Sequence, residues 1–124
     1  MSYPIYTTYL LTNANRSVLY TGMTNNLRRR LVEHWIGREG AFTTRYQAHF
    51  LVWLEDTRYV LNAIALEKRI KNRERVWKNA LIEKSNTDWR FLNSDILGYW
   101  PPTEEDIADI KALWNRYPNT REAW

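Results

Sequence analysis

Residue types that suit phosphate chemistry fall within one short stretch, residues 19–34. Tyr20 and Gly22 come at the end of a strand-forming run, and Gly22 permits a close backbone approach. Arg30 and His34 follow four residues apart, so a helix would place them on one face. Arginine side chains and helix N-termini both bind phosphate oxygens. The stretch therefore predicts a phosphate site, with a solvated surface helix as the alternative.

A strand, a turn and a helix must position these side chains. The polar segment 24–26 is typical of a strand end followed by a helix cap. Leu27, Leu31 and Trp35 then recur at helical spacing, which predicts a helix with a buried stripe.

A second tyrosine, Tyr9, lies in another strand-like run at residues 5–11. The polar segment 12–17 between the two runs predicts a hairpin loop. Two adjacent antiparallel strands would then bring Tyr9 and Tyr20 next to Arg30.

The following segments predict a loop, a strand and a helix. Residues 37–46 contain two glycines and paired threonines, which are typical of a loop. Residues 50–54 form a continuous apolar run, which favours a strand buried on both faces over an edge strand. Asp56 or Thr57 then caps a helix that runs to about Arg73. The predicted apolar face of this helix consists of Leu61, Ile64, Ala65, Leu66 and Ile70.

The C-terminal segment, residues 98–124, predicts one amphipathic helix. Thr103 and Asp106 have the spacing of a capping box, and Pro118 marks the end of the apolar stripe. We expect a domain at residues 1–97 and a helical extension at residues 98–124. The extension packs either on that domain or on a protein partner.

Together these elements predict an α/β fold of the α+β type. Its sheet is small and mainly antiparallel, with three strands at about residues 5–12, 17–22 and 49–55. Helices flank the sheet, and an extra helix follows at the C-terminus.

Length and charge narrow the class of protein. The 124 residues are a single-domain length, and the absence of cysteine excludes disulfides and cysteine-based zinc sites. Residues 1–100 hold 15 Lys and Arg against 9 Asp and Glu, whereas residues 101–124 hold 3 against 5. The basic surplus of the first part indicates a nucleic-acid backbone as the ligand.

Targeting signals are not apparent in the sequence. No apolar run is long enough to cross a bilayer, and residues 1–4 do not have the pattern of a signal peptide. We therefore expect a cytoplasmic protein with no membrane contact.

A known family shares this pattern of residues. Tyr9, the triplet 20–22, Arg30, His34 and Glu67 resemble the signature of the GIY-YIG nucleases. The first triplet is degenerate, since Thr7-Thr8-Tyr9 keeps only the tyrosine, and Thr21 stands where Ile or Val is usual. The resemblance spans about residues 6–92 and is nearest to small stand-alone bacterial members and a related structure-specific endonuclease subunit.

The resemblance implies a metal-dependent DNA endonuclease, similar to those that act on DNA structures in repair or recombination. Tyr9 would take a proton from the attacking water, Tyr20 would orient water or phosphate, and His34 would assist. Arg30 would bind the phosphate. Glu67 would hold one Mg²⁺ or Mn²⁺ ion.

Glu67 has a second explanation in the sequence itself, as the helical partner of Lys71. The resemblance favours the metal role, because residues 65–71 follow the family's Glu-Lys-x-Ile-Lys pattern. The further substrate-binding candidates are Gly22, Arg29, Arg45, Lys71 and Asn86. The family's late asparagine corresponds to Asn79 or Asn86, and the sequence does not choose between them.

Two other classes of function remain open at this point. One is a non-catalytic nucleic-acid-binding module on the same scaffold, and the other is an adaptor that binds a protein through the C-terminal helix. If the protein is an endonuclease, the sequence leaves its substrate open among branched, nicked or duplex DNA, and RNA.

Overall fold

A three-stranded antiparallel sheet forms the centre of the fold. The structure is a computed structural model and describes residues 3–37 and 41–118. The strands are β1 (Tyr6–Thr12), β2 (Leu19–Thr24) and β3 (Phe50–Thr57), in the order β2-β1-β3. The predicted α+β class is confirmed, and each predicted strand overlaps an observed one.

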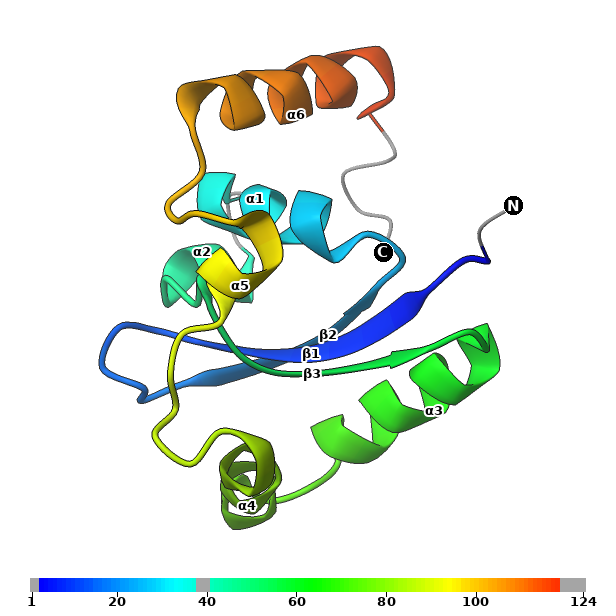
Figure 1. The fold of residues 1–124 in the computed structure, drawn as a ribbon, viewed down its shortest axis with the longest axis vertical. Coiled ribbons are helices and arrows are strands. Elements are labelled where there is room, and N and C mark those ends of the chain that lie inside the picture. The colour runs from blue at the N-terminus through cyan, green and yellow to red at the C-terminus, as the bar shows by residue number, and fades with distance from the viewer. Residues whose placement is uncertain (1–2, 38–40, 119–124) are drawn as a thin grey trace.

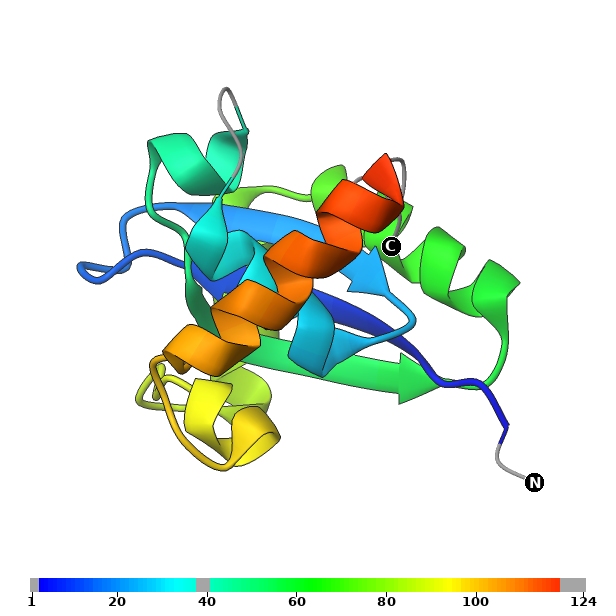
Figure 2. The same ribbon diagram turned by 90° about the horizontal axis from the view of Figure 1, so that it is seen from above.

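Helices cover both faces of this sheet (Figures 1 and 2). On one side lie α1 (Leu27–Ile36), α2 (Phe42–Arg45), α5 (Asn93–Leu97) and α6 (Glu104–Arg116), with α6 outermost over α1. On the other side lie α3 (Val60–Lys71) and α4 (Arg75–Ser85). In the described part of the chain, no helix has the length and apolar character needed to span a membrane.

Side-chain alternation along β1 supplies two separate cores. Tyr9 and Leu11 point to the α1 side, and Leu10 between them points to the α3 side, as the period of a strand requires. All three side chains are fully buried. The central strand therefore joins both layers and holds Tyr9 rigidly in place.

The polar residue before α1 caps this helix as the sequence predicts. The Asn26 side chain accepts a hydrogen bond from the Arg29 backbone N–H at 3.1 Å. Leu31 is fully buried, and Leu27 packs against the same core. These contacts set the rotation of α1, and with it the direction of Arg30 and His34.

The predicted start of α3 is wrong. The strand β3 continues to Thr57, and the helix begins at Val60 after Tyr59. Leu61 and Ala65, which we expected on the apolar face, are exposed, Leu61 to 75%, whereas Ala63 is fully buried. The reason is close packing on the sheet, where the Thr8 hydroxyl donates to the Ala63 carbonyl at 3.2 Å.

Two further predictions need correction. Residues 42–45 of the predicted loop form the short helix α2, while residues 38–40 of it lie outside the described residues. The apolar third strand is an edge strand, yet it is covered by the chain after α4. Leu51 donates to the Asn93 side chain and accepts from the Leu92 backbone, both at 2.8 Å. This cover explains why an edge strand carries an apolar sequence.

Candidate active site

The β1–β2 hairpin brings the two tyrosines onto one face. Tyr9 pairs with Gly22 and Leu11 pairs with Tyr20, so both phenols point towards α1. Their ring centroids lie 6.3 Å apart. A side chain at Gly22 would overlap the Tyr9 ring, with its Cβ 2.5 Å from Tyr9 Cζ. Gly22 is thus the position that makes room for Tyr9.

His34 joins this pair from α1. The Tyr9 hydroxyl and His34 Nε2 are 2.8 Å apart, and both groups are buried. The other ring nitrogen, Nδ1, lies 3.2 Å from the Thr43 hydroxyl on α2. The Tyr20 and His34 rings meet edge to face at 5.3 Å. His34 therefore links the strand tyrosines to α2.

Burial keeps both partners of this hydrogen bond neutral. It raises the pKa of Tyr9 well above its ordinary value, with the Tyr20 hydroxyl adding to the rise and Arg30 opposing it. Burial and the charge of Arg30 lower the pKa of His34 to about 3. The Tyr9 O–H therefore donates to Nε2, and the Nδ1–H donates to Thr43. The charge of Arg30 favours the Tyr9 phenolate, but in the free protein desolvation outweighs it.

Arg30 approaches the same tyrosine from the helix turn before His34. It forms a hydrogen bond with Tyr9, and its Nη1 also donates to Glu33 Oε1 at 3.3 Å. Glu33 is only 4% exposed, and its second oxygen accepts from Trp114 Nε1 of α6 at 2.9 Å. Sequence reasoning missed Glu33 and Trp114. The spacing of Glu33 from Arg30 was a usable signal, whereas nothing in the sequence indicates a contact between residues 81 positions apart.

Glu67 lies on α3 and forms an ion pair with Lys71, with Nζ and Oε1 2.8 Å apart. The negative charge of Glu67 also raises the pKa of Tyr9, and this is the smallest of the contributions to that pKa. No group of three or more His, Asp or Glu side chains that could hold a metal occurs among the described residues. Mg²⁺ commonly binds one or two carboxylates and completes its shell with water and substrate phosphate. The partly exposed Glu67 carboxylate fits that type of site.

The other predicted site residues each contact a different part of the protein. Arg29 Nε lies 3.7 Å from Glu33 Oε1, and Arg45 is exposed with its guanidinium 5.3 Å from the Tyr46 ring. Asn86 is the C-cap residue of α4, a helix that lies on the opposite side of the sheet from α1. Its amide donates to Val52 and Arg90 carbonyls and accepts from the Arg90 N–H, all within 3.0 Å. These bonds give Asn86 a structural role. The alternative Asn79 accepts from Arg75 Nε at 2.8 Å.

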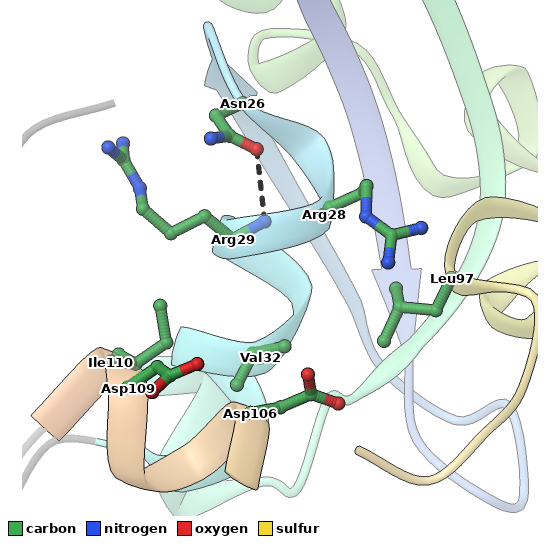
Figure 3. Close-up of a pocket in the computed structure, with 8 residues that line it drawn as sticks. All are labelled: Asn26, Arg28, Arg29, Val32, Leu97, Asp106, Asp109 and Ile110. Atoms are coloured by element: carbon green, nitrogen blue, oxygen red, sulfur yellow. Dashed lines mark hydrogen bonds between the residues drawn. The ribbon is translucent and has the colours of Figure 1, made fainter. Parts of the chain in front are cut away.

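A pocket lies between α1 and α6 (Figure 3). Arg28 and Arg29 line it from α1, and Asp106 and Asp109 face them from α6. None of Tyr9, Tyr20, His34 or Glu67 contributes to its lining. The candidate active site is therefore the cluster around Tyr9 and not this pocket.

The paired strand tyrosines lie beside an arginine and a histidine on a three-stranded antiparallel sheet, as the resemblance to the GIY-YIG nucleases implies. The family model of the GIY-YIG catalytic domain matches residues 5–80, which include β1, β2, α1 and α3. The chain therefore belongs to the GIY-YIG nuclease superfamily, whose members are endonucleases that act on DNA and generally use divalent metal ions. No curated protein and no solved structure matches the chain.

Proposed function

We propose that the protein is a metal-dependent DNA endonuclease that recognises DNA structure and acts in repair or recombination. The observation that carries this proposal is the buried Tyr9 hydroxyl bonded to a neutral His34 beside Arg30. Its domain would be residues 1–97, and its location the cytoplasm.

The hydrogen-bond chain supports a role for Tyr9 as the general base. Tyr9 would accept the proton of the attacking water while its own proton passes to His34 Nε2, whose lowered pKa the bound, negatively charged phosphate would raise. The Nδ1–H of His34 would keep its hydrogen bond to the Thr43 hydroxyl. This bond fixes the ring in the tautomer whose Nε2 can accept the proton. The relay lets a phenol with a raised pKa act without first becoming a phenolate in the free protein.

Arg30 would bind the scissile phosphate and stabilise the charge that develops on its oxygens. Tyr20, next to His34, would orient the water or the phosphate. Glu67 would hold one Mg²⁺ or Mn²⁺ ion, which supplies further charge neutralisation on the phosphate. Lys71 would then release Glu67 and bind the DNA backbone, together with Arg29 and Arg45.

A cleavage assay tests the proposal directly. Labelled flap, branched, nicked and intact duplex DNA are incubated with the protein and Mg²⁺, and the products are separated on denaturing gels. Glu67→Ala should abolish cleavage with DNA affinity unchanged or slightly higher, because a negative charge near the phosphate is removed. The matched control is Glu55→Ala, an exposed glutamate on β3. It should cut at the wild-type rate.

The alternative is a DNA-binding module without catalysis. The ion pair between Glu67 and Lys71 favours it, because a glutamate committed to a helical partner need not hold a metal. Wild-type protein that binds the DNA panel but cuts none of it with either Mg²⁺ or Mn²⁺ would establish this alternative.

A further inference from the structure

Glu33 is a buried carboxylate that the proposed reaction does not use. Its side chain is 3% exposed, and a charge so far from water is costly unless it is paired. Oε1 faces Arg30 at 3.3 Å and Arg29 at 3.7 Å, and Oε2 accepts from Trp114 at 2.9 Å. Both oxygens are thus held in fixed directions.

Arg30 stands between this carboxylate and the tyrosine cluster. A guanidinium is rigid and planar, so a hydrogen bond at one nitrogen sets the direction of its other donors. Glu33 accepts a hydrogen bond from Arg30 Nη1, and the Arg30 side chain also forms a hydrogen bond with Tyr9. Arg30 has a mobile side chain by nature, and Glu33 restricts it to the orientation that serves Tyr9.

Trp114 holds Glu33 from outside the family-matched segment. It lies on α6, which begins with a capping box at Thr103 and packs on α1 through Ile107 and Ile110. At the Asp106 end the two helices leave the pocket of Figure 3 between them. The Trp114 hydrogen bond is therefore a specific link between α6 and α1, separate from their apolar contact.

We propose that Glu33 is a positioning residue for Arg30 and that Trp114 fixes Glu33, so that α6 completes the active site. The inference rests on the proposed function, because it assigns Arg30 a task at the phosphate. It explains what the C-terminal helix contributes beyond stability.

A double-mutant cycle tests the coupling of Glu33 and Arg30. Single-turnover cleavage at saturating DNA is measured for the wild type, Glu33→Gln, Arg30→Lys and the double variant. Glu33→Gln should lower the rate by about ten-fold or more, since one charge-assisted contact is lost. The double variant should match Arg30→Lys within about two-fold, because Glu33 acts through Arg30. Additive losses, or a wild-type rate for Glu33→Gln, would overturn the inference.

Trp114→Phe tests the contribution of α6 while keeping an aromatic ring in the interface. We expect a slower cleavage step with little change in DNA affinity. The matched control is Trp89→Phe, which removes a similar bond, from Trp89 Nε1 to Glu83 at 3.0 Å, away from the site. If both variants cut equally well, or lose activity equally, α6 has only a structural role. Thermal unfolding of each variant shows that the fold is retained.

DNA affinity is a second quantity to measure in the same double-mutant cycle. It is measured by fluorescence anisotropy for the same four proteins, without divalent metal ions. A wild type that binds but does not cut refutes the proposed function, while non-additive affinity losses still support the Glu33–Arg30 coupling. A protein that neither binds nor cuts DNA overturns both.

Discussion

Gly22 and Tyr9 are direct partners across the β1–β2 pair, and the Tyr9 ring fills the space where a side chain at Gly22 would lie. The hairpin register therefore fixes both the position and the orientation of the proposed base. Tyr20 also borders this space, with its Cε1 2.9 Å from the position of a Cβ.

Gly22→Ala should displace Tyr9 and strongly reduce cleavage. The added methyl group meets two aromatic rings, and overpacking of this kind costs about 1–3 kcal/mol of stability. Gly98→Ala is the control, because Gly98 has φ +89° and an added methyl group there would have no atom within 4 Å. It should lose about 1–2 kcal/mol through backbone strain and keep its activity. Chemical denaturation and the gel assay measure both effects. Full activity in Gly22→Ala would show that Tyr9 need not keep this position.

Tyr9→Phe should bind DNA normally and cut poorly. Only the hydroxyl is lost, so packing against Gly22 is preserved while the proton path to His34 is broken. The buried His34 Nε2 also loses its partner, which costs about 1–3 kcal/mol of folding free energy. Tyr20→Phe serves as a comparison and should lose less activity, because the Tyr20 and His34 rings meet edge to face and phenylalanine preserves that contact. Equal losses in the two variants would argue against Tyr9 as the base.

Stability should fall as the pH drops below 6.5. The pKa of His34 is about 3 in the folded protein and 6.5 in the unfolded chain, so only the unfolded chain takes up a proton between these values. The stabilisation is complete above pH 6.5 and is lost as the pH falls towards 3. At pH 5 the loss is about 2 kcal/mol.

Urea titrations at pH 7 and pH 5 measure this loss. His34→Gln keeps an acceptor for Tyr9 and should show a much smaller difference between the two pH values. Some dependence of the stability on pH remains because of His49, since burial lowers its pKa too. An unchanged pH dependence in His34→Gln would show that His34 is not the group responsible.

DNA affinity should weaken steeply with salt, because contacts to the backbone release counterions. Arg69 and Arg73 are exposed on and after α3, close in sequence to Glu67, and their guanidinium groups lie 5.8 and 5.1 Å from the Trp77 ring. Arg73→Ala should weaken binding to all DNA structures alike and reduce the salt slope by about 1. Anisotropy titrations at several salt concentrations measure the slope. An unchanged slope would place the DNA path elsewhere.

The sequence predicted the architecture well because the decisive signals are local. Alternating and helical apolar spacing, with Asn26 as a cap, identified the strands and α1. The start of α3 was misplaced because Asp56 resembles a cap, while in the fold its side chain accepts from Thr7 on the neighbouring strand at 2.6 Å. A local pattern cannot show that cross-strand partner.

The site was predicted only in part, for a similar reason. The tyrosines, Arg30 and His34 follow from the spacing and the family resemblance. The bonds that orient them, from His34 to Thr43 and from Trp114 to Glu33, join separate helices and depend on packing. Desolvation of Tyr9 likewise depends on the folded surroundings, so the direction of its pKa shift could not be predicted.

The cover over β3 has a consequence for any shortened form of the protein. Leu92 and Asn93 form hydrogen bonds with the outward-facing backbone groups of Leu51, and the Asn93 side chain also donates to the His49 carbonyl. A fragment that stops at residue 80, where the family match ends, loses this cover. It would present a bare apolar sheet edge, which is a template for aggregation. The folding unit is thus longer than the family segment.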